Sequence, residues 1–207
     1  MTVGRRGEGT TWDGYAASVT SLVEDARVIA EQHLASELPR RWYHVQAVAA
    51  KAERVAHVVA AADGPILIAS AWLHDIGYAP ALAETGFHPL DGARWLRSKS
   101  FHPRVTALVA HHSCALIEAD ERGLSAVLAR EFPNEESVTA DALWYCDMTT
   151  GPDGQDFQAT ERLDEIRLRY GPDHIVTRFV NRAEPLILAS VRRTKGRLAE
   201  ESDVQPM

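Results

Sequence analysis

Seven histidine and aspartate residues follow one another in an order that suits a metal site. They are His44, the adjacent pair His74 and Asp75, then His88, the adjacent pair His111 and His112, and finally Asp147. Imidazole nitrogens together with carboxylate oxygens suit borderline or hard divalent ions such as Zn, Fe, Mn or Mg. The sequence therefore predicts a divalent metal site whose ligands come from separate segments of the chain.

The pair His74 and Asp75 gains weight from its surroundings. It ends the apolar run 65–73 and is followed at once by Ile76 and Gly77. A charged group at the end of such a run is costly to bury unless it is paired or binds a metal. We therefore expect this pair to lie at the end of a buried helix and to contribute metal ligands.

Asp147 also continues an apolar helical face. Residues Ala140, Leu143, Trp144 and Asp147 follow the i, i+3, i+4, i+7 spacing of one side of a helix. An acid in that position must pair with something positive, so an ordinary cap or salt bridge is the alternative to a metal. A lone His44 on the rim of its apolar stripe would likewise be a packing residue, and only the accompanying ligands favour a metal role.

The elements that must position these residues are helices, and we predict an all-α fold. Prolines that suit the first helical turn begin several of them. We expect one helical domain over 12–195, a flexible N-terminal arm over 1–11 and a flexible tail over 196–207. The expected helices cover 13–35, 39–62, 65–73, 89–98, 103–112, 122–131, 135–149, 159–170 and 174–194.

Length and composition bound the class of protein. A chain of 207 residues with 45% hydrophobic and 25% charged residues is typical of a single globular domain. A net charge of -7 argues against a nucleic-acid-coating protein, whereas small phosphorylated substrates remain open. The two cysteines, Cys114 and Cys146, have no metal-like spacing, which favours a reducing compartment such as the cytoplasm. We expect no membrane span and no secretory signal, because no apolar run approaches ~20 residues.

Residues 40–150 resemble the HD-domain superfamily of metal-dependent phosphohydrolases. The matching segments are Arg41-Trp42-Tyr43-His44, Leu73-His74-Asp75-Ile76-Gly77 and Trp144-Tyr145-Cys146-Asp147. The resemblance implies a single-domain helical bundle of the HD type. It also implies that one metal ion is bound by His44, His74, Asp75 and Asp147.

A second metal is implied by the segment His88-Pro89-Leu90-Asp91-Gly92-Ala93. It resembles the His-x-x-x-Gly-Ala segment of HD proteins that hold two metals, in which a following helix supplies another histidine. By similarity His111 matches best. Helical periodicity favours His112 instead, since it shares a face with Val105, Leu108 and Val109. We rank His111 first and keep His112 as the second candidate.

The resemblance implies hydrolysis of a phosphomonoester or phosphodiester, in a nucleotide or similar small metabolite, by a metal-activated water. Asp75 and His74 would be the central residues, with one or two ions of Fe, Mn, Zn, Mg or Co. Arg41, in the Arg-x-x-His pattern, and Lys51, two turns after His44, are candidates for phosphate contacts. The alternative for Lys51 is a stem that covers apolar surface. Two other functions stay open: a mixed-valence di-iron oxygenase of the HD fold and a non-catalytic nucleotide-binding regulator.

Overall fold

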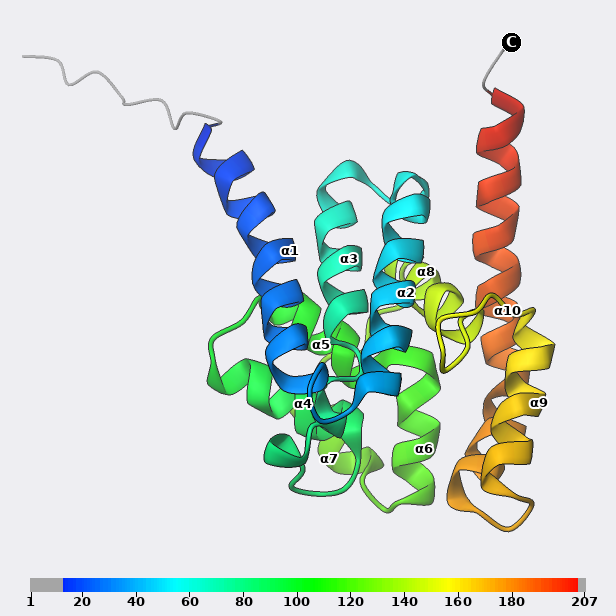
Figure 1. Cartoon of the computed structure of the whole chain (residues 1–207). Helices are drawn as coiled ribbons and strands as arrows, with labels where there is room; N and C mark the ends of the chain where they lie inside the picture. Colours follow the sequence, from blue (N-terminus) through cyan, green and yellow to red (C-terminus); the bar gives the residue numbers. More distant parts are fainter. Residues whose placement is uncertain (1–12, 205–207) are drawn as a thin grey trace, which may run out of the picture.

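The computed structural model describes the backbone of residues 13–204 and the side chains of 21–201. This part of the chain is all-α, as predicted, and its only β feature is an isolated bridge between Thr150 and Asp156 (Figure 1). The expected arm over 1–11 lies outside the described residues. Among those residues, no helix combines the length and the apolar character that a membrane crossing requires.

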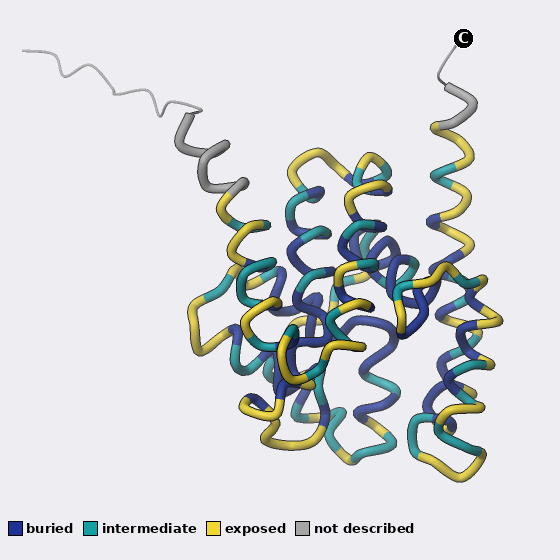
Figure 2. Tube along the Cα trace, in the orientation of Figure 1, coloured by how far each residue is buried: buried dark blue, intermediate teal, exposed yellow. Residues whose placement is uncertain are grey.

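The helix α3 (Gly64–Leu73) is the centre of the fold. It is almost entirely apolar and buried, and it contacts α1 (Asp13–Leu34), α2 (Pro39–Val55), α5 (Pro103–His111) and α8 (Val138–Met148). Its apolar neighbours form one large core that includes Leu67 and Leu73. Figure 2 shows that the buried residues gather in the middle of the molecule, where these helices meet. A ligand at the end of α3 is therefore deep in the molecule, because helices surround it.

Two further groups of helices complete the bundle. The helix α4 (His88–Ser98) packs against α5 and shares a small core with α6 (Ala115–Glu121) and α7 (Ser125–Glu131). On the other side, α9 (Ala159–Tyr170) and α10 (Ile175–Val204) pack together, and α10 also covers α8. Figure 1 shows α9 and α10 side by side along one flank of the molecule.

Local sequence explains where several helices begin. Proline occupies the first turn of α2, α3, α4 and α5, where its missing N–H costs no hydrogen bond. Ser137 caps α8, because its hydroxyl accepts a hydrogen bond from the Ala140 backbone N–H at 3.0 Å. These starting points agree with the predicted helices.

The structure differs from the prediction in three elements. The helix α6 was not predicted, and α2 ends at Val55, after which short 3-10 turns (Ala56–Val58 and Ala61–Asp63) reach α3. The helix α10 continues to Val204, so much of the expected tail over 196–207 is helical. Its extension is held by Leu198, which packs on the main core, and by Arg193 and Arg197, which pair with Asp141 on α8.

Candidate metal centre

Four imidazole rings converge where the central helices end. His44 comes from α2, His74 caps the C-terminus of α3, His88 is the first residue of α4, and His112 follows α5 directly. The Nε2 atoms of His44 and His74 lie 3.3 Å apart. Those of His88 and His112 lie 3.2 Å apart. The four rings thus form two pairs, each with its Nε2 atoms turned toward one another.

Backbone carbonyls orient three of these rings. The Nδ1 atoms of His44, His74 and His112 lie 3.0, 2.8 and 2.7 Å from the carbonyl oxygens of Gly151, Ala71 and Val109 respectively. A carbonyl oxygen can only accept a hydrogen bond, so each Nδ1 carries the proton and donates it. When these rings are neutral, their lone pairs are therefore on Nε2, and the Nε2 atoms point into the centre, as in metal sites whose ligands are oriented by such contacts.

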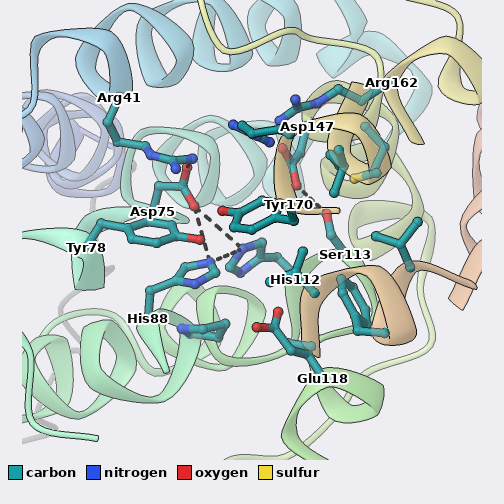
Figure 3. Close-up of a pocket in the computed structure, with 18 residues that line it drawn as sticks. Arg41, Asp75, Tyr78, His88, His112, Ser113, Glu118, Asp147, Arg162 and Tyr170 are labelled. Carbon is teal, nitrogen blue, oxygen red and sulfur yellow. Dashed lines mark hydrogen bonds and ion pairs between the residues drawn. The ribbon is translucent and has the colours of Figure 1, made fainter. Parts of the chain in front are cut away.

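The carboxylate of Asp75 lies between the two pairs of rings. Its Oδ2 is 3.4 Å from His74 Nε2 and 3.8 Å from His44 Nε2. Its Oδ1 is 3.3 Å from His88 Nε2 and 3.9 Å from His112 Nε2 (Figure 3). Each oxygen therefore faces its own histidine pair, and two groups that could hold a metal share this one aspartate. This is the arrangement expected of a carboxylate that bridges two ions.

Asp147 at the end of α8 adds an acidic group on the His44 side. Its Oδ1 lies 3.2 Å from His44 Nε2 and 3.8 Å from His74 Nε2. The hydroxyl of Ser113 donates a hydrogen bond to the other oxygen, Oδ2. The positive partner expected for this acid is therefore a pair of histidines that are themselves candidate ligands, and a serine binds its second oxygen.

The spacing of the ligand atoms fits bound metal ions. Two nitrogens bonded to one Zn-like ion at ~2.0–2.1 Å lie roughly 3.0–3.4 Å apart, depending on the angle between the bonds. The two Nε2–Nε2 distances of 3.3 and 3.2 Å fall in that range. Nitrogen and carboxylate donors of this kind suit Zn, Fe or Mn. The residues present therefore fit one divalent ion in each group.

The electrostatics of the centre favour positive charge. Burial opposes protonation of His74, yet the carboxylates of Asp75 and Asp147 raise its pKa to about 9. Burial alone would raise the pKa of Asp75, but Arg41 and His74 hold that pKa well below its usual value. For His112, burial and then the neighbouring His88 and His74 lower the pKa to about 3, so its ring is neutral at pH 7. The carboxylates are thus ionised in a buried place that a cation would stabilise.

Two glycines bring His88 close to Asp75. A Cβ atom on Gly77, two residues after Asp75, would lie 2.0 Å from the His88 carbonyl oxygen and 2.6 Å from the Gly92 nitrogen. A Cβ on Gly92 would meet Gly77 and Ile76 at 3.0 Å. The backbones of these two segments can therefore touch only because neither position has a side chain.

The backbone after His112 is strained. Ser113 and Cys114 have positive φ values of 47° and 62°, which residues with a Cβ rarely adopt. This turn separates α5 from α6, keeps His112 aimed at Asp75 and brings Ser113 to Asp147. Strain of this kind persists where surrounding contacts hold it, most often at functional sites.

His111 does not reach the centre, contrary to the ranking of the two adjacent histidines. Its Nε2 lies 3.0 Å from the carbonyl oxygen of Phe132 and its Nδ1 is buried without a partner. His112, the residue that follows α5, takes the position expected for His111. The helix ends at His111, and the extended backbone of His112 (φ -60°, ψ 149°) and the contact of its Nδ1 with the Val109 carbonyl direct this ring toward Asp75.

Arg41 and Lys51 have different surroundings. The guanidinium of Arg41 lies 2.5 Å from Asp75 Oδ2 and 4.1 Å above the ring of Tyr78. Lys51 is buried away from the centre, contrary to the expected phosphate contact. Its amine donates to the Thr149 carbonyl and hydroxyl at 2.6 and 2.8 Å and pairs with Asp156 at 2.7 Å. It anchors the loop whose Gly151 carbonyl orients His44.

A cavity of about 80 Å³ opens onto the centre. Asp75, His88, His112 and Asp147 line it, together with Arg41. Sequence reasoning missed the other polar residues of its wall, which are Tyr78, Ser113, Glu118, Arg162, Arg169 and Tyr170 (Figure 3). One signal was available for two of them, because arginines seven residues apart on a predicted helix share a face.

Comparisons with known proteins add nothing to this geometry. No protein family, no curated protein and no solved structure matches the chain.

Proposed function

We propose that the protein is a metal-dependent phosphoric ester hydrolase of the HD type, acting on a nucleotide or a similar small phosphorylated metabolite. The observation that carries this proposal is the position of Asp75, whose two oxygens each face a separate pair of imidazoles. Phosphatases and nucleases commonly use two ions about 3.5–4 Å apart to assist an in-line displacement at phosphorus. The order of the ligands along the chain, which resembles that of HD proteins, is a second argument.

When bound, the ions would supply Lewis acidity and an activated water. His44, His74 and Asp147 would hold one ion, His88 and His112 the other, and Asp75 both. Other residues of the chain would bind the substrate and support the ligands. Arg41 lines the cavity beside Asp75 and can bind the phosphate oxygens of a substrate. Tyr78 stacks on the His88 ring at 3.9 Å and fixes it from the outer side.

The size of the cavities agrees with a small substrate. The cavity at the centre, about 80 Å³, is below the 300–1,000 Å³ typical of whole drug-sized ligands, so it suits a compact anionic group. A neighbouring cavity of about 300 Å³ is lined by His44 and shares Arg41 and Arg169 with the first. The organic part of a substrate could lie there.

The test combines metal analysis with turnover. The purified protein is analysed for metals and assayed on a panel of phosphorylated metabolites, alongside Asp75→Ala and Asp25→Ala. Asp25 is a suitable control because it is exposed on α1, where it accepts a hydrogen bond from the hydroxyl of Ser21, and it lines neither cavity. We expect Asp75→Ala to lose hydrolysis and most of the metal with its helical content kept, and Asp25→Ala to match the wild type.

Two results would contradict the proposal. One is normal turnover by Asp75→Ala on a substrate that the wild type hydrolyses. The other is an iron-loaded protein that hydrolyses nothing in the panel and consumes oxygen with an organic substrate, which would identify an oxygenase.

A further inference from the structure

The wall of the cavity contributed by α9 carries two arginines that the metal ligands do not require. Arg162 and Arg169 both line the cavity. Figure 3 places Arg162 beside Asp147, across the cavity from His88. Arg162 is only 4% exposed, and its Nε–H is buried without a hydrogen-bond partner. A buried N–H of a charged group without a partner is costly, so this site lacks an acceptor.

The charge on this wall is not balanced. Glu165 is the carboxylate that pairs with both guanidiniums: its Oε2 with Arg162 Nη1, and its Oε1 with Arg169 Nε at 3.4 Å. One negative charge thus serves two positive charges. Of the other acids of the cavity, Asp75 pairs with Arg41 at 2.5 Å and Glu118 pairs with Arg122 at 2.6 Å. Asp147 lies beside Arg162, but its direct contacts are with His44, His74 and Ser113. The two guanidiniums of the α9 wall therefore share one directly paired carboxylate.

Arginine suits one kind of ligand in such a place. Its planar guanidinium binds phosphate or carboxylate oxygens through charge-assisted hydrogen bonds, with Nε and Nη available together. The excess of guanidinium groups over paired carboxylates and the unpaired Nε–H both favour binding of an anionic oxygen. The metal centre on the opposite wall favours binding of a second anionic group.

We propose that Arg162 and Arg169 form a second anion site, which binds a phosphate or carboxylate group next to the phosphoryl group held at the metal centre. The preferred substrate is then compact and carries two anionic groups, as a diphosphate does. This inference rests on the proposed function for the identity of the group at the metal centre. The anion site itself rests on α9 alone.

Binding of two non-hydrolysable probes tests the inference. Methylphosphonate carries one anionic group and methylenebisphosphonate carries two. Their affinities for the metal-loaded protein are measured by titration calorimetry, and the metal content is checked after each titration, because bisphosphonates chelate metals. We expect the wild type to prefer methylenebisphosphonate by about tenfold or more, the effect of one added charge-assisted hydrogen bond.

Three variants test whether the preference for methylenebisphosphonate depends on the arginines of the cavity or on any positive charge on α9. Arg162→Gln should lose the preference while it keeps the metal. Arg167→Gln should keep it, because Arg167 lies on the same helix but pairs with Asp164 and Glu184 outside the cavity. Glu165→Gln should strengthen binding of methylenebisphosphonate, since it removes the negative charge that the two arginines share.

Equal wild-type affinity for the two probes would overturn the inference, as would an unchanged preference in Arg162→Gln. If circular dichroism shows that Arg162→Gln does not fold, the same comparison is made with Arg169→Gln. Loss of the preference in that variant supports the site, and its retention overturns it. A preference without hydrolysis of any ester would leave the anion site standing and refute the proposed function. Hydrolysis of an ester without the preference for methylenebisphosphonate would support the proposed function and overturn the anion site.

Discussion

Each histidine of the metal centre has one nitrogen that faces inward, and for three of them the backbone decides which. The carbonyls of Ala71, Val109 and Gly151 hold the Nδ1 protons, so none of these three rings must change tautomer before it can bind an ion. Such contacts typically change metal affinity 10- to 100-fold when they are lost. The choice between His111 and His112 is also local: α5 ends at His111, and the contact of His112 with the Val109 carbonyl directs the second ring to the centre.

The two adjacent histidines give a matched pair of variants. We expect His112→Ala to lower the bound metal by about one ion per chain, because it removes half of the pair that faces Asp75 Oδ1. His111→Ala should keep the wild-type metal content, since its ring contacts the Phe132 carbonyl instead. Elemental analysis of both proteins checks this. Equal metal loss in the two variants would contradict the assignment.

At the scale of elements, the centre depends on how closely the turn after α3 approaches α4. Gly77 and Gly92 allow this contact, and it carries His88 to within 3.3 Å of Asp75. The strained turn at Ser113 and Cys114 acts in the same way for α5. Neither contact contributes a ligand, but each fixes the position of one.

We expect Gly77→Ala to destabilise the protein by about 1–3 kcal/mol or more, the usual cost of overpacking, because its Cβ would lie 2.0 Å from the His88 carbonyl oxygen. Metal binding should weaken as well, as α4 moves outward. Gly196→Ala is the control: this glycine is exposed in α10 with open space around it, so alanine should stabilise by about 0.5–1 kcal/mol. Thermal denaturation measures both effects, and a neutral Gly77→Ala would show that the close contact is dispensable.

The contact between α4 and α7 has a predictable response to acid. The carboxylate of Glu131 accepts hydrogen bonds from Arg94 and Arg97, and these lower its pKa from 4.5 to about 2. A lowered pKa in the folded state stabilises the protein above about pH 4.5, and this contribution disappears as the pH falls toward 2. We expect Glu131→Gln to cost about 1 kcal/mol near pH 6, since solvent screens part of the interaction.

The difference in the free energy of unfolding between wild type and Glu131→Gln should shrink as the pH falls through about 2, where Glu131 of the folded protein becomes protonated. Denaturation curves at a series of pH values measure it. Glu53→Gln, exposed on α2, provides the comparison. A difference that is constant with pH would mean that packing, and not charge, makes the contribution of Glu131.

At the scale of the whole molecule, the candidate metal centre lies where helices from separate packing groups meet. Its candidate ligands come from α2, α4 and α8 and from the turns after α3 and α5. A bound ion would therefore link elements that otherwise touch mainly through apolar side chains. The stability of the entire bundle should depend on metal for this reason.

Removing the metal should lower the melting temperature. At a free metal concentration 100 times the Kd, binding adds about 2.7 kcal/mol to the free energy of unfolding. For a chain of this length that corresponds to roughly 5–10 °C. Differential scanning calorimetry with and without a chelator measures the shift, and Asp75→Ala should show none. A melting temperature that no divalent ion changes would argue against a metal in this site.

Most helices and candidate ligands could be predicted from the sequence, because helix formation depends mainly on residues that are close together in the chain. Apolar spacing and first-turn prolines located most helices. Six of the seven candidate ligands lie at the centre, and the exception is His111. The helix α6 was missed, because the left-handed Ser113 and Cys114 before it carry no glycine or asparagine to mark a turn. Arg162 and Arg169 were missed because charged residues on a helix most often face solvent, and only the packing of α9 buries Arg162 and places Arg169 at the wall of the cavity.

The separation of the ligands along the chain sets an order of events in time. His44 and Asp147 are 103 residues apart, and their side chains meet only after α2, α3 and α8 have docked. Closing such a distance is slow compared with forming any single helix. In a zinc finger, neighbouring ligands capture the ion early and the ion drives folding. Here the helices must assemble first, so binding of an ion would come at the end of folding and would report that the chain has reached its native topology.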